Sequence, residues 1–209
     1  MQTIELFAGT KSFSKVAAAR GHDTFTVDYD ARFDTDICRD ILKVSPTELP
    51  YKPDILWASP PCTCFSVASI GRYWNKDYST KDRRADQAIE IVKHTLYLIN
   101  QVQPRIFIIE NPRGMLRKHP VMAGLTRMTV TYCQYGDTRM KPTDLWSNYV
   151  LPLKPPCKNG DPCHVSAPRG SRTGTQGIKG ARDRSQVPAQ LCEDIIRFCE
   201  ENIGNSILL

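Results

Sequence analysis

Short apolar runs alternate with stretches of helical periodicity over most of the chain. Runs with the length and composition of buried strands occupy residues 3–7, 24–27, 55–58 and 106–109. Apolar positions recur at helical spacing in residues 12–21, 85–99 and 188–198. Strands that alternate with helices predict an α/β fold, in which a mostly parallel sheet carries helices on both faces.

The region after residue 125 departs from this alternation. Two apolar runs, 128–132 and 145–150, flank a Gly-containing link and predict an antiparallel hairpin at one end of the sheet. Residues 151–184 are rich in Pro and Gly and have no periodicity, so they predict an irregular insertion. We therefore predict a core at 1–150, an insertion at 151–184, and a C-terminal helix at 185–209 that completes the core.

Composition is that of a single soluble domain. The chain has 209 residues, of which 41% are hydrophobic and 24% charged. No apolar run approaches the roughly 20 residues that a membrane span needs, and no signal-peptide pattern opens the chain. Eight cysteines without a secretion signal indicate a reducing compartment. We expect a cytoplasmic protein without membrane association, in which thiols serve chemistry or metal binding rather than a disulfide framework.

Positive charge is concentrated in the insertion. The net charge of the chain is +6, and the segment from Lys154 to Arg184 holds seven cations, Arg169 and Arg172 among them, against two aspartates. A local basic surface predicts a polyanionic partner such as nucleic acid. A second basic stretch, 71–84, interleaves cations with Tyr73, Trp74 and Tyr78, a mixture suited to phosphate contact and base stacking. An exposed loop with solvated charges is the alternative for that stretch.

Reactive residues follow two of the predicted strands. Cys62 comes after the run 55–58 and a Pro-Pro turn, and Glu110 directly follows the run 106–109. In a parallel sheet with right-handed crossovers these two strand ends face the same edge. The pattern therefore predicts one pocket that contains both side chains. Taken singly, a buried thiol beside a stiff turn and an ordinary strand-end acid are the alternatives.

The first strand leads into a Gly-containing turn and then a helix, as in the opening unit of a nucleotide-binding fold. Asp28 ends the second strand, 19 positions after Gly9, where such units place an acid that binds ribose hydroxyls. A strict Gly-x-Gly pattern would need glycine where Lys11 stands. An ordinary tight turn and a solvated aspartate are the alternative.

Cys157, Cys163 and His164, with Cys133, are of the residue types that bind zinc. Their spacing contains no Cys-x-x-Cys pair, and the three in the insertion fall short of a closed four-ligand site. We therefore predict no metal centre from the sequence, while leaving a zinc site open as the alternative.

Five partial motifs, in order along the chain, resemble the DNA cytosine-5 methyltransferases that use S-adenosylmethionine. They are the segment from Glu5 to Gly9 with Ser12-Phe13-Ser14, then Pro60-Pro61-Cys62 with Phe65-Ser66, then Glu110-Asn111, Tyr135-Gly136, and the segment from Arg184 to Pro188. The resemblance runs from residue 5 to residue 198. It implies a Rossmann-like methyltransferase fold and transfer of a methyl group to carbon 5 of a cytosine flipped out of double-stranded DNA.

The resemblance also implies roles for individual residues. Cys62 would add to carbon 6 of the cytosine, and Glu110 would hydrogen-bond ring nitrogen 3 and the exocyclic amine. Residues expected to bind S-adenosylmethionine are Phe7, Ala8, Gly9, Thr10, Ser12, Asp28, Asp36, Ile37, Pro60, Ser185 and Val187. Residues expected to bind nucleic acid are Ser66, Arg72, Lys76, Arg113, Arg169 and Arg172. We expect the strand-to-helix turn and nearby cations such as Arg113 to lower the pKa of Cys62, and we interpret Cys64 as a packing residue.

The chain departs from the family pattern at several positions. Thr63 stands where glutamine is usual, Pro112 replaces a valine, and Lys141-Pro142-Thr143 replaces an Arg-x-Arg pair. Only residues 150–184 stand in place of a large target-recognition domain. Three alternatives stay open: methylation of RNA by the same chemistry, methylation of an exocyclic amine, and a non-catalytic nucleic-acid-binding relative. The sequence does not predict the oligomeric state.

Overall fold

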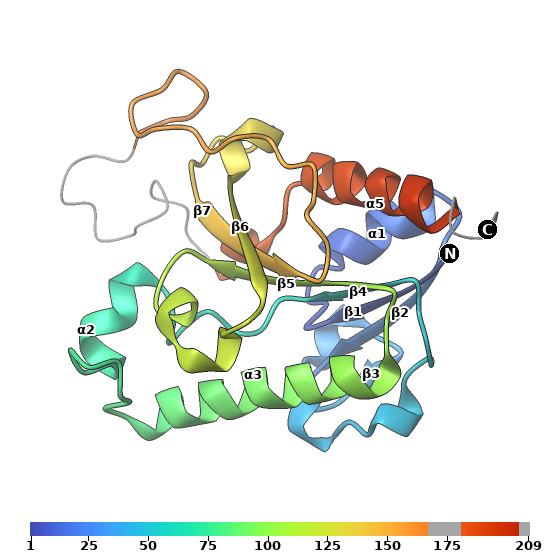
Figure 1. The fold of residues 1–209 in the computed structure, drawn as a ribbon, viewed down its shortest axis with the longest axis horizontal. Helices are drawn as coiled ribbons and strands as arrows, with labels where there is room; N and C mark the ends of the chain where they lie inside the picture. The colour runs from blue at the N-terminus through green and yellow to red at the C-terminus, as the bar shows by residue number, and fades with distance from the viewer. Residues whose placement is uncertain (167–180, 205–209) are drawn as a thin grey trace.

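The computed structural model describes residues 1–166 and 181–204, and these residues build a seven-stranded sheet with the order β3-β2-β1-β4-β5-β7-β6 (Figure 1). The strands are β1 (Gln2–Leu6), β2 (Asp23–Asp28), β3 (Ile37–Cys38), β4 (Ile55–Ala58), β5 (Ile106–Pro112), β6 (Thr126–Thr131) and β7 (Pro142–Ser147). The first five are parallel, and β7 runs antiparallel to both β5 and β6. The predicted α/β class and terminal hairpin are confirmed.

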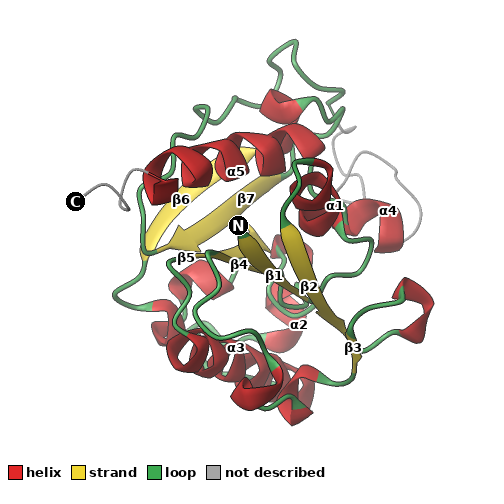
Figure 2. Ribbon diagram, turned by 90° about the vertical axis from the view of Figure 1, so that its right-hand side faces the viewer, coloured by secondary structure: helices red, strands yellow, loops and turns green. Residues whose placement is uncertain are grey.

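Helices cover both faces of the sheet (Figure 2). The helices α1 (Ser12–Ala19) and α5 (Ala189–Gly204) lie on one face, and α3 (Arg83–Val102) lies on the other. Two short helices, α2 (Ile70–Tyr73) and α4 (Ala181–Ser185), lie outside these layers. Among the described residues, no helix has both the length and the apolar character that crossing a membrane requires.

Strand β4 shows why the central strands read as unbroken apolar runs. Ile55 and Trp57 pack into the core beneath α1 and α5, whereas Leu56 and Ala58 pack into the core beneath α3. Successive side chains of a strand point to opposite faces, and here both faces are covered. Phe13 of α1 stacks on Trp57 with ring centroids 5.1 Å apart, which fixes α1 over the centre of the sheet.

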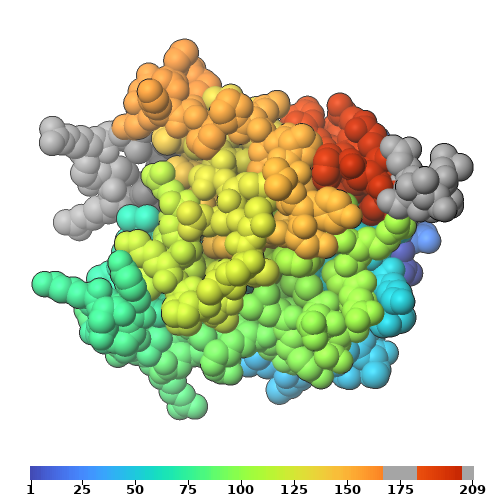
Figure 3. Space-filling model, in the orientation of Figure 1, coloured from blue at the N-terminus to red at the C-terminus, as the bar shows by residue number. Residues whose placement is uncertain are grey.

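The second predicted strand of the hairpin is misplaced by three residues. The apolar run predicted a strand at 145–150, but β7 ends at Ser147, and Tyr149 and Val150 are exposed. The first described part of the insertion, 151–166, forms no helix or strand and lies on the surface beside the hairpin (Figure 3). Its last residues, 181–184, belong to α4, so the prediction of an irregular segment is wrong there. Arg169 and Arg172 lie outside the described residues.

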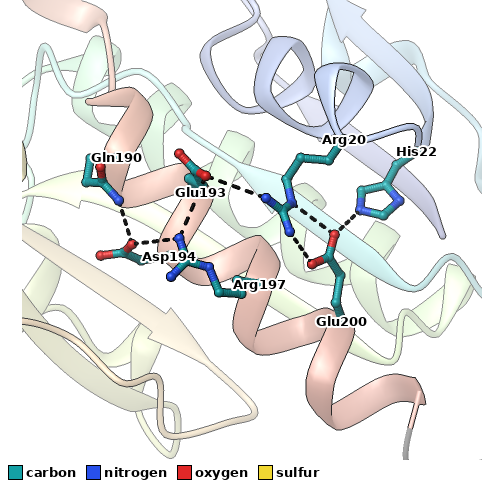
Figure 4. Close-up of polar contacts among 7 residues, drawn as sticks. All are labelled: Arg20, His22, Gln190, Glu193, Asp194, Arg197 and Glu200. Carbon is teal, nitrogen blue, oxygen red and sulfur yellow. Dashed lines mark hydrogen bonds and ion pairs between the residues drawn. The ribbon is translucent and has the colours of Figure 1, made fainter.

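The C-terminal helix is fastened to the first βα unit by a polar network (Figure 4). Arg20 donates to both carboxylate oxygens of Glu200, at 3.0 and 2.6 Å, and His22 Nε2 lies 2.8 Å from Glu200 Oε1. The hydrogen bond from Arg20 lowers the pKa of Glu200, and the contact with His22 adds to that shift. Contacts between α1 and α5 thus make the last helix part of the core.

Candidate active site

The strand order predicts a ligand-binding crevice at the carboxyl edge of the sheet. From β1 the chain builds outward to β2 and β3, and then returns to place β4 on the other side of β1. The segment after β1 therefore leads to α1 on one face, and the segment after β4 leads to α2 and α3 on the other. Open α/β sheets bind ligands where adjacent segments diverge in this way.

Cys62 and Glu110 lie at this edge, on the exits of neighbouring parallel strands. Ala58 of β4 pairs with Ile109 of β5, and Asn111 Nδ2 donates to the carbonyl of Pro60 at 2.8 Å. Glu110 is buried, at 5% exposure, whereas Cys62 is exposed at the mouth. The structure thus brings together the thiol and the carboxyl group that the strand pattern predicted to share a pocket.

The pKa of Cys62 is raised rather than lowered, which corrects the expectation from sequence. Although its surface is open to solvent, protein is dense around the sulfur; the resulting desolvation raises the pKa, and repulsion by the Glu110 carboxylate raises it further. The cations that oppose this shift are Lys141 and Arg184, a role that sequence reasoning gave to Arg113. The Cys62 thiol is therefore predominantly protonated at neutral pH in this state.

Tyr132 and Lys141 belong to the site and were missed by sequence reasoning. The Tyr132 hydroxyl donates to Glu110 Oε1 at 2.9 Å, and burial raises the pKa of this tyrosine well above its ordinary value. Lys141 Nζ lies 4.5 Å from the centre of the Tyr132 ring. The available signal was the position of Lys141 in the segment where the family carries an Arg-x-Arg pair.

The turn after β1 has a constrained backbone. Phe7, Gly9 and Lys11 all have positive φ, of 60°, 48° and 57°, and the Gly9 amide donates to Asp28 Oδ2 at 2.9 Å. Lys11 adopts the left-handed conformation that glycine adopts most readily, so the turn forms without a strict Gly-x-Gly sequence. Glu5 accepts the amides of Phe13 and Ser14 at the start of α1, at 3.2 and 2.8 Å.

The two aspartates predicted to bind cofactor differ in placement. Asp28 ends β2 at the crevice, and its carboxylate accepts the Gly9 and Asp30 amides. Asp36 Oδ2 instead accepts the amide and the hydroxyl of Thr26, at 2.8 and 2.7 Å, so it fastens the start of β3 to β2. Ile37 is partly buried against the core on the α3 side of the sheet.

Two further side chains near Asp28 were missed by sequence reasoning. Asp40 follows the carboxyl end of β3 and accepts the Leu42 amide at 3.1 Å. Tyr29, next to Asp28, is 74% exposed, which is unusual for a large aromatic residue at a crevice. Tyr29 follows the end of β2, and Asp40 lies two residues after the end of β3. Because β3 has only two residues, the apolar pattern of the sequence did not reveal its end.

The segment before α5 reaches the turn after β1. The Val187 amide donates to Ser12 Oγ at 3.3 Å, and Ser12 Oγ lies 3.2 Å from Thr10 Oγ1. Arg139 Nη1 and Lys141 Nζ donate to the carbonyls of residues 183 and 184, both at 3.1 Å. Ser12 and Val187 come from opposite ends of the chain and were predicted to bind the same ligand. The structure places them in contact.

The predicted nucleic-acid-binding side chains have mixed outcomes. Arg72, Lys76 and Arg113 are exposed, and Ser66 is partly buried with its hydroxyl 3.1 Å from that of Ser69. Tyr73 and Trp74 are buried, so the expectation that they stack on bases is wrong. Their indole and phenol rings fill the core because this stretch folds as α2 and a tight turn rather than as an open loop.

Cys64 lies two residues after Cys62 and points into the core. It is 6% exposed, and its carbonyl accepts the Trp74 indole N–H at 2.7 Å. The interpretation of Cys64 as a packing residue is therefore supported by its burial. Downstream, the Met115 amide donates to the carbonyl of Phe65 at 2.6 Å, which joins the segment after Cys62 to the exit of β5.

The sequence of the chain is similar to those of known proteins. The sequence profile of the family described as "C-5 cytosine-specific DNA methylase" matches residues 1–125. The chain is 29% identical, over 222 residues, to the "Probable DNA (cytosine-5)-methyltransferase" of Frog virus 3 (isolate Goorha), covering 95% of this chain and 100% of that relative.

The comparison with solved structures supports the fold through one match at a TM-score of 0.50, and a second structure matches at a lower score. The Entamoeba histolytica methyltransferase EhMeth matches with a TM-score of 0.50 and 12% identity, over 76% of this chain and 57% of that one. The S. pombe Dnmt2 methyltransferase matches with a TM-score of 0.43 and 14% identity, over 70% of this chain and 48% of that one. The matched part of the present chain therefore spans only about half the length of these two structures.

Proposed function

The chain belongs to the C-5 cytosine-specific DNA methylase family, and on that premise we propose that it methylates carbon 5 of cytosine in double-stranded DNA with S-adenosylmethionine as methyl donor. The observation that carries the proposal is that Cys62 and Glu110 follow the carboxyl ends of the neighbouring parallel strands β4 and β5. A hydrogen bond from Asn111 to the Pro60 carbonyl joins the two segments. A thiol nucleophile beside a hydrogen-bonding carboxyl group is the pair that this reaction needs.

The crevice beside β1 fits the methyl donor, which supplies an activated methyl group on a sulfonium centre. The backbone of Phe7, Ala8, Gly9 and Thr10 forms a preshaped turn, and Asp28 stands at the end of the next strand, where ribose hydroxyls are bound in such folds. Ser12 and Val187 bound the crevice on the α5 side, and Pro60 and Ser185 are proposed to line it with them.

Residues revealed by the structure extend this proposed donor site. We propose that Tyr29 offers its exposed ring to the adenine, because a flat aromatic face beside the ribose acid suits stacking. Asp40 is a better candidate than Asp36 for a polar contact with the adenine, because Asp36 is engaged by Thr26 and lies upstream of the strand end.

Carbon 5 of cytosine is too weak a nucleophile to take a methyl group directly. In the proposed reaction the Cys62 thiolate adds to carbon 6, which turns carbon 5 into an enamine-like nucleophile. Glu110 in its protonated form donates to ring nitrogen 3 and delivers its proton there as the thiolate adds, which neutralises the adduct, and a carboxyl oxygen accepts from the exocyclic amine. The Tyr132 hydroxyl orients Glu110. Methyl transfer, loss of the carbon 5 proton and expulsion of Cys62 then complete the cycle.

The target base must leave the duplex to reach Cys62, at a cost of a few kcal/mol. Arg72, Lys76 and Arg113 are exposed cations in the segments that follow β4 and β5, and we propose that they contact DNA phosphates. Residues 150–184 offer little chain for reading bases, so we expect a short target sequence, loose specificity, or a partner chain that supplies recognition.

Mass spectrometry of nucleosides tests the proposal. DNA and RNA are incubated separately with the protein and isotopically labelled S-adenosylmethionine, and we expect labelled 5-methylcytosine from DNA. Label in RNA alone would assign the RNA reaction, and label on an exocyclic nitrogen would assign an amino-methyltransferase. No product, together with no binding of S-adenosylmethionine in calorimetry, would leave a non-catalytic nucleic-acid-binding relative.

A further inference from the structure

Four potential metal ligands that are scattered in the sequence meet beside the hairpin. They are Cys133, Cys157, Cys163 and His164, and one ligand atom from each lies within 4.8 Å of all the others. Cys133 is buried, and the other three are partly buried. The sequence spacing did not predict this site, because Cys133 comes from the short helix that follows β6 and its partners come from the insertion.

Three of the distances between these atoms match the edges of a zinc tetrahedron. With Zn–S near 2.3 Å and Zn–N near 2.1 Å, tetrahedral geometry puts two sulfurs about 3.8 Å apart and a sulfur and a nitrogen about 3.6 Å apart. The Cys133–Cys163 sulfurs are 3.7 Å apart, and His164 Nδ1 lies 3.7 Å from Cys157 Sγ and 3.5 Å from Cys163 Sγ. The Cys133–Cys157 sulfurs are closer, at 3.1 Å.

The backbone around the cluster is held by its own hydrogen bonds. Between Cys157 and Cys163 the chain makes a tight turn, in which the Lys158 amide donates to Asp161 Oδ2 at 2.7 Å and Gly160 has a φ of 96°. The Cys157 amide donates to Thr131 Oγ1 at 3.0 Å, and the Val165 amide donates to the Thr138 carbonyl at 3.0 Å. The ligands are therefore presented from both sides of the cluster on anchored chain segments.

The surroundings of the cluster suit a bound cation. Nε2 of His164 is buried without a hydrogen-bond partner, so the polar contacts of this ring run through Nδ1 to the sulfurs. Gln134 Nε2 lies 3.5 Å from Cys163 Sγ, an outer contact of the kind that orients a thiolate ligand. A shallow hollow lined by Cys133, Cys163 and His164 opens to solvent and gives an ion access.

We propose that Cys133, Cys157, Cys163 and His164 bind one structural Zn²⁺ that fastens the basic insertion to the end of the hairpin. Three thiols lose their protons on binding, so the ion and its ligands carry a net charge of −1, and four protein ligands leave no position for catalysis. Three thiolates and one imidazole favour zinc over the hard cations Mg²⁺ and Ca²⁺.

The position of the site gives it a second consequence, which rests on the proposed function. Cys133 directly follows Tyr132 in the short helix η7 (Tyr132–Tyr135), and Tyr132 donates to Glu110. A metal that holds η7 therefore also holds the tyrosine that orients the catalytic carboxyl group. The same ion would hold the segment of Lys154 and Lys158 beside η7, where the Lys154 amide donates to the Tyr135 hydroxyl.

Metal analysis of the purified full chain tests the proposal independently of methylation. We expect about one equivalent of zinc per chain by mass spectrometry, and strong visible absorption with a thiolate charge-transfer band after replacement by Co²⁺. Cys163→Ser and His164→Ala should lose most of the metal, and Cys38→Ser, which removes an exposed cysteine outside the cluster, should retain it. Chelation should lower the Tm of the wild type and of Cys38→Ser alike.

Two results would overturn the proposal. One is a wild-type protein free of zinc that also fails to bind Co²⁺ with the tetrahedral spectrum. The other is a Cys133–Cys157 disulfide in freshly purified protein, detected as two thiols that resist alkylation until they are reduced. Both measurements use the wild type, so the outcome does not depend on whether the variants fold, and neither depends on the presence of methyltransferase activity.

Discussion

The hydroxyl of Tyr132 donates a 2.9 Å hydrogen bond to Oε1 of Glu110 inside the protein, where both side chains are buried. Glu110 comes from β5, and Tyr132 is the first residue of η7, directly after β6. In the sheet, β7 lies between β5 and β6. The hairpin therefore does more than extend the sheet. The segment that follows β6 supplies a hydroxyl group that hydrogen-bonds the Glu110 carboxyl group.

Replacing Tyr132 by phenylalanine should reduce turnover more than binding. The change removes one hydrogen bond to a charged group, worth about 1.5–3 kcal/mol, so we expect kcat to fall roughly 10- to 100-fold. The KM for S-adenosylmethionine should stay within a factor of about two, because Tyr132 lies on the Glu110 side of the site. Steady-state kinetics at saturating DNA measures both. An equal rise in KM with unchanged kcat would contradict the positioning role.

The two neighbouring cysteines provide a matched pair of variants. Cys62→Ser should abolish methylation and covalent trapping by DNA that contains 5-fluorocytosine, because serine is not ionised near neutral pH. Cys64→Ala should retain both activities and instead lose stability, by about 1 kcal/mol, because its side chain is buried in the core. Gel electrophoresis of the trapped complex and urea unfolding separate the two effects. Trapping by Cys62→Ser with none by Cys64→Ala would assign the nucleophile to the other thiol.

Removing the charge of Glu110 should make the Cys62 thiol more reactive towards alkylation and should at the same time slow methylation. The Glu110 carboxylate raises the pKa of Cys62, so Glu110→Gln should lower that pKa and increase the fraction of thiolate at a given pH. We expect faster alkylation of Cys62 by iodoacetamide at pH 8, together with a steep fall in methylation. Alkylation is measured by peptide mass spectrometry, with the exposed Cys38 as an internal reference.

Lys141→Gln provides the opposite change in the same assay. Lys141 lowers the pKa of Cys62, so removing its charge should raise that pKa further and slow alkylation at pH 8. The rate of methylation should then increase at a higher pH than in the wild type, because the Cys62 thiol loses its proton at a higher pH. Alkylation rates that move in the same direction in Glu110→Gln and Lys141→Gln would exclude an electrostatic origin.

The sequence was sufficient to predict the edge of the sheet at which Cys62 and Glu110 lie. Cys62 and Glu110 each follow a short apolar run, and parallel strands bring such ends together without any knowledge of side-chain contacts. Tyr132 and the Cys133 cluster depend on how β6, β7 and the insertion pack, which local patterns do not encode. The burial of Tyr73 and Trp74 was missed for a similar reason, because their charged neighbours suggested an exposed loop.

Glycine at position 114 is required by a close approach of two backbones. A Cβ at this position would lie 2.0 Å from the Phe65 carbonyl oxygen, so either the Phe65 or the Gly114 backbone must move to accept a side chain. The amides of Phe65 and Ser66 both donate to the Cys62 carbonyl at 3.0 Å. A shift of the Phe65 backbone is therefore expected to move Cys62 as well. The conflict is therefore expected to affect both stability and catalysis.

Gly114→Ala should lower the free energy of unfolding by about 1–3 kcal/mol and slow single-turnover methylation by roughly 100-fold, since a misplacement near 1 Å costs about that much. The affinity for S-adenosylmethionine should change little, because the proposed donor crevice lies beside β1. Gly71→Ala is the matched control: no atom lies within 4 Å of its added Cβ, and alanine favours the helix α2. Urea unfolding, calorimetry and rapid-quench kinetics measure the three quantities. Full activity in Gly114→Ala would show that the segment after Cys62 adjusts without moving the thiol.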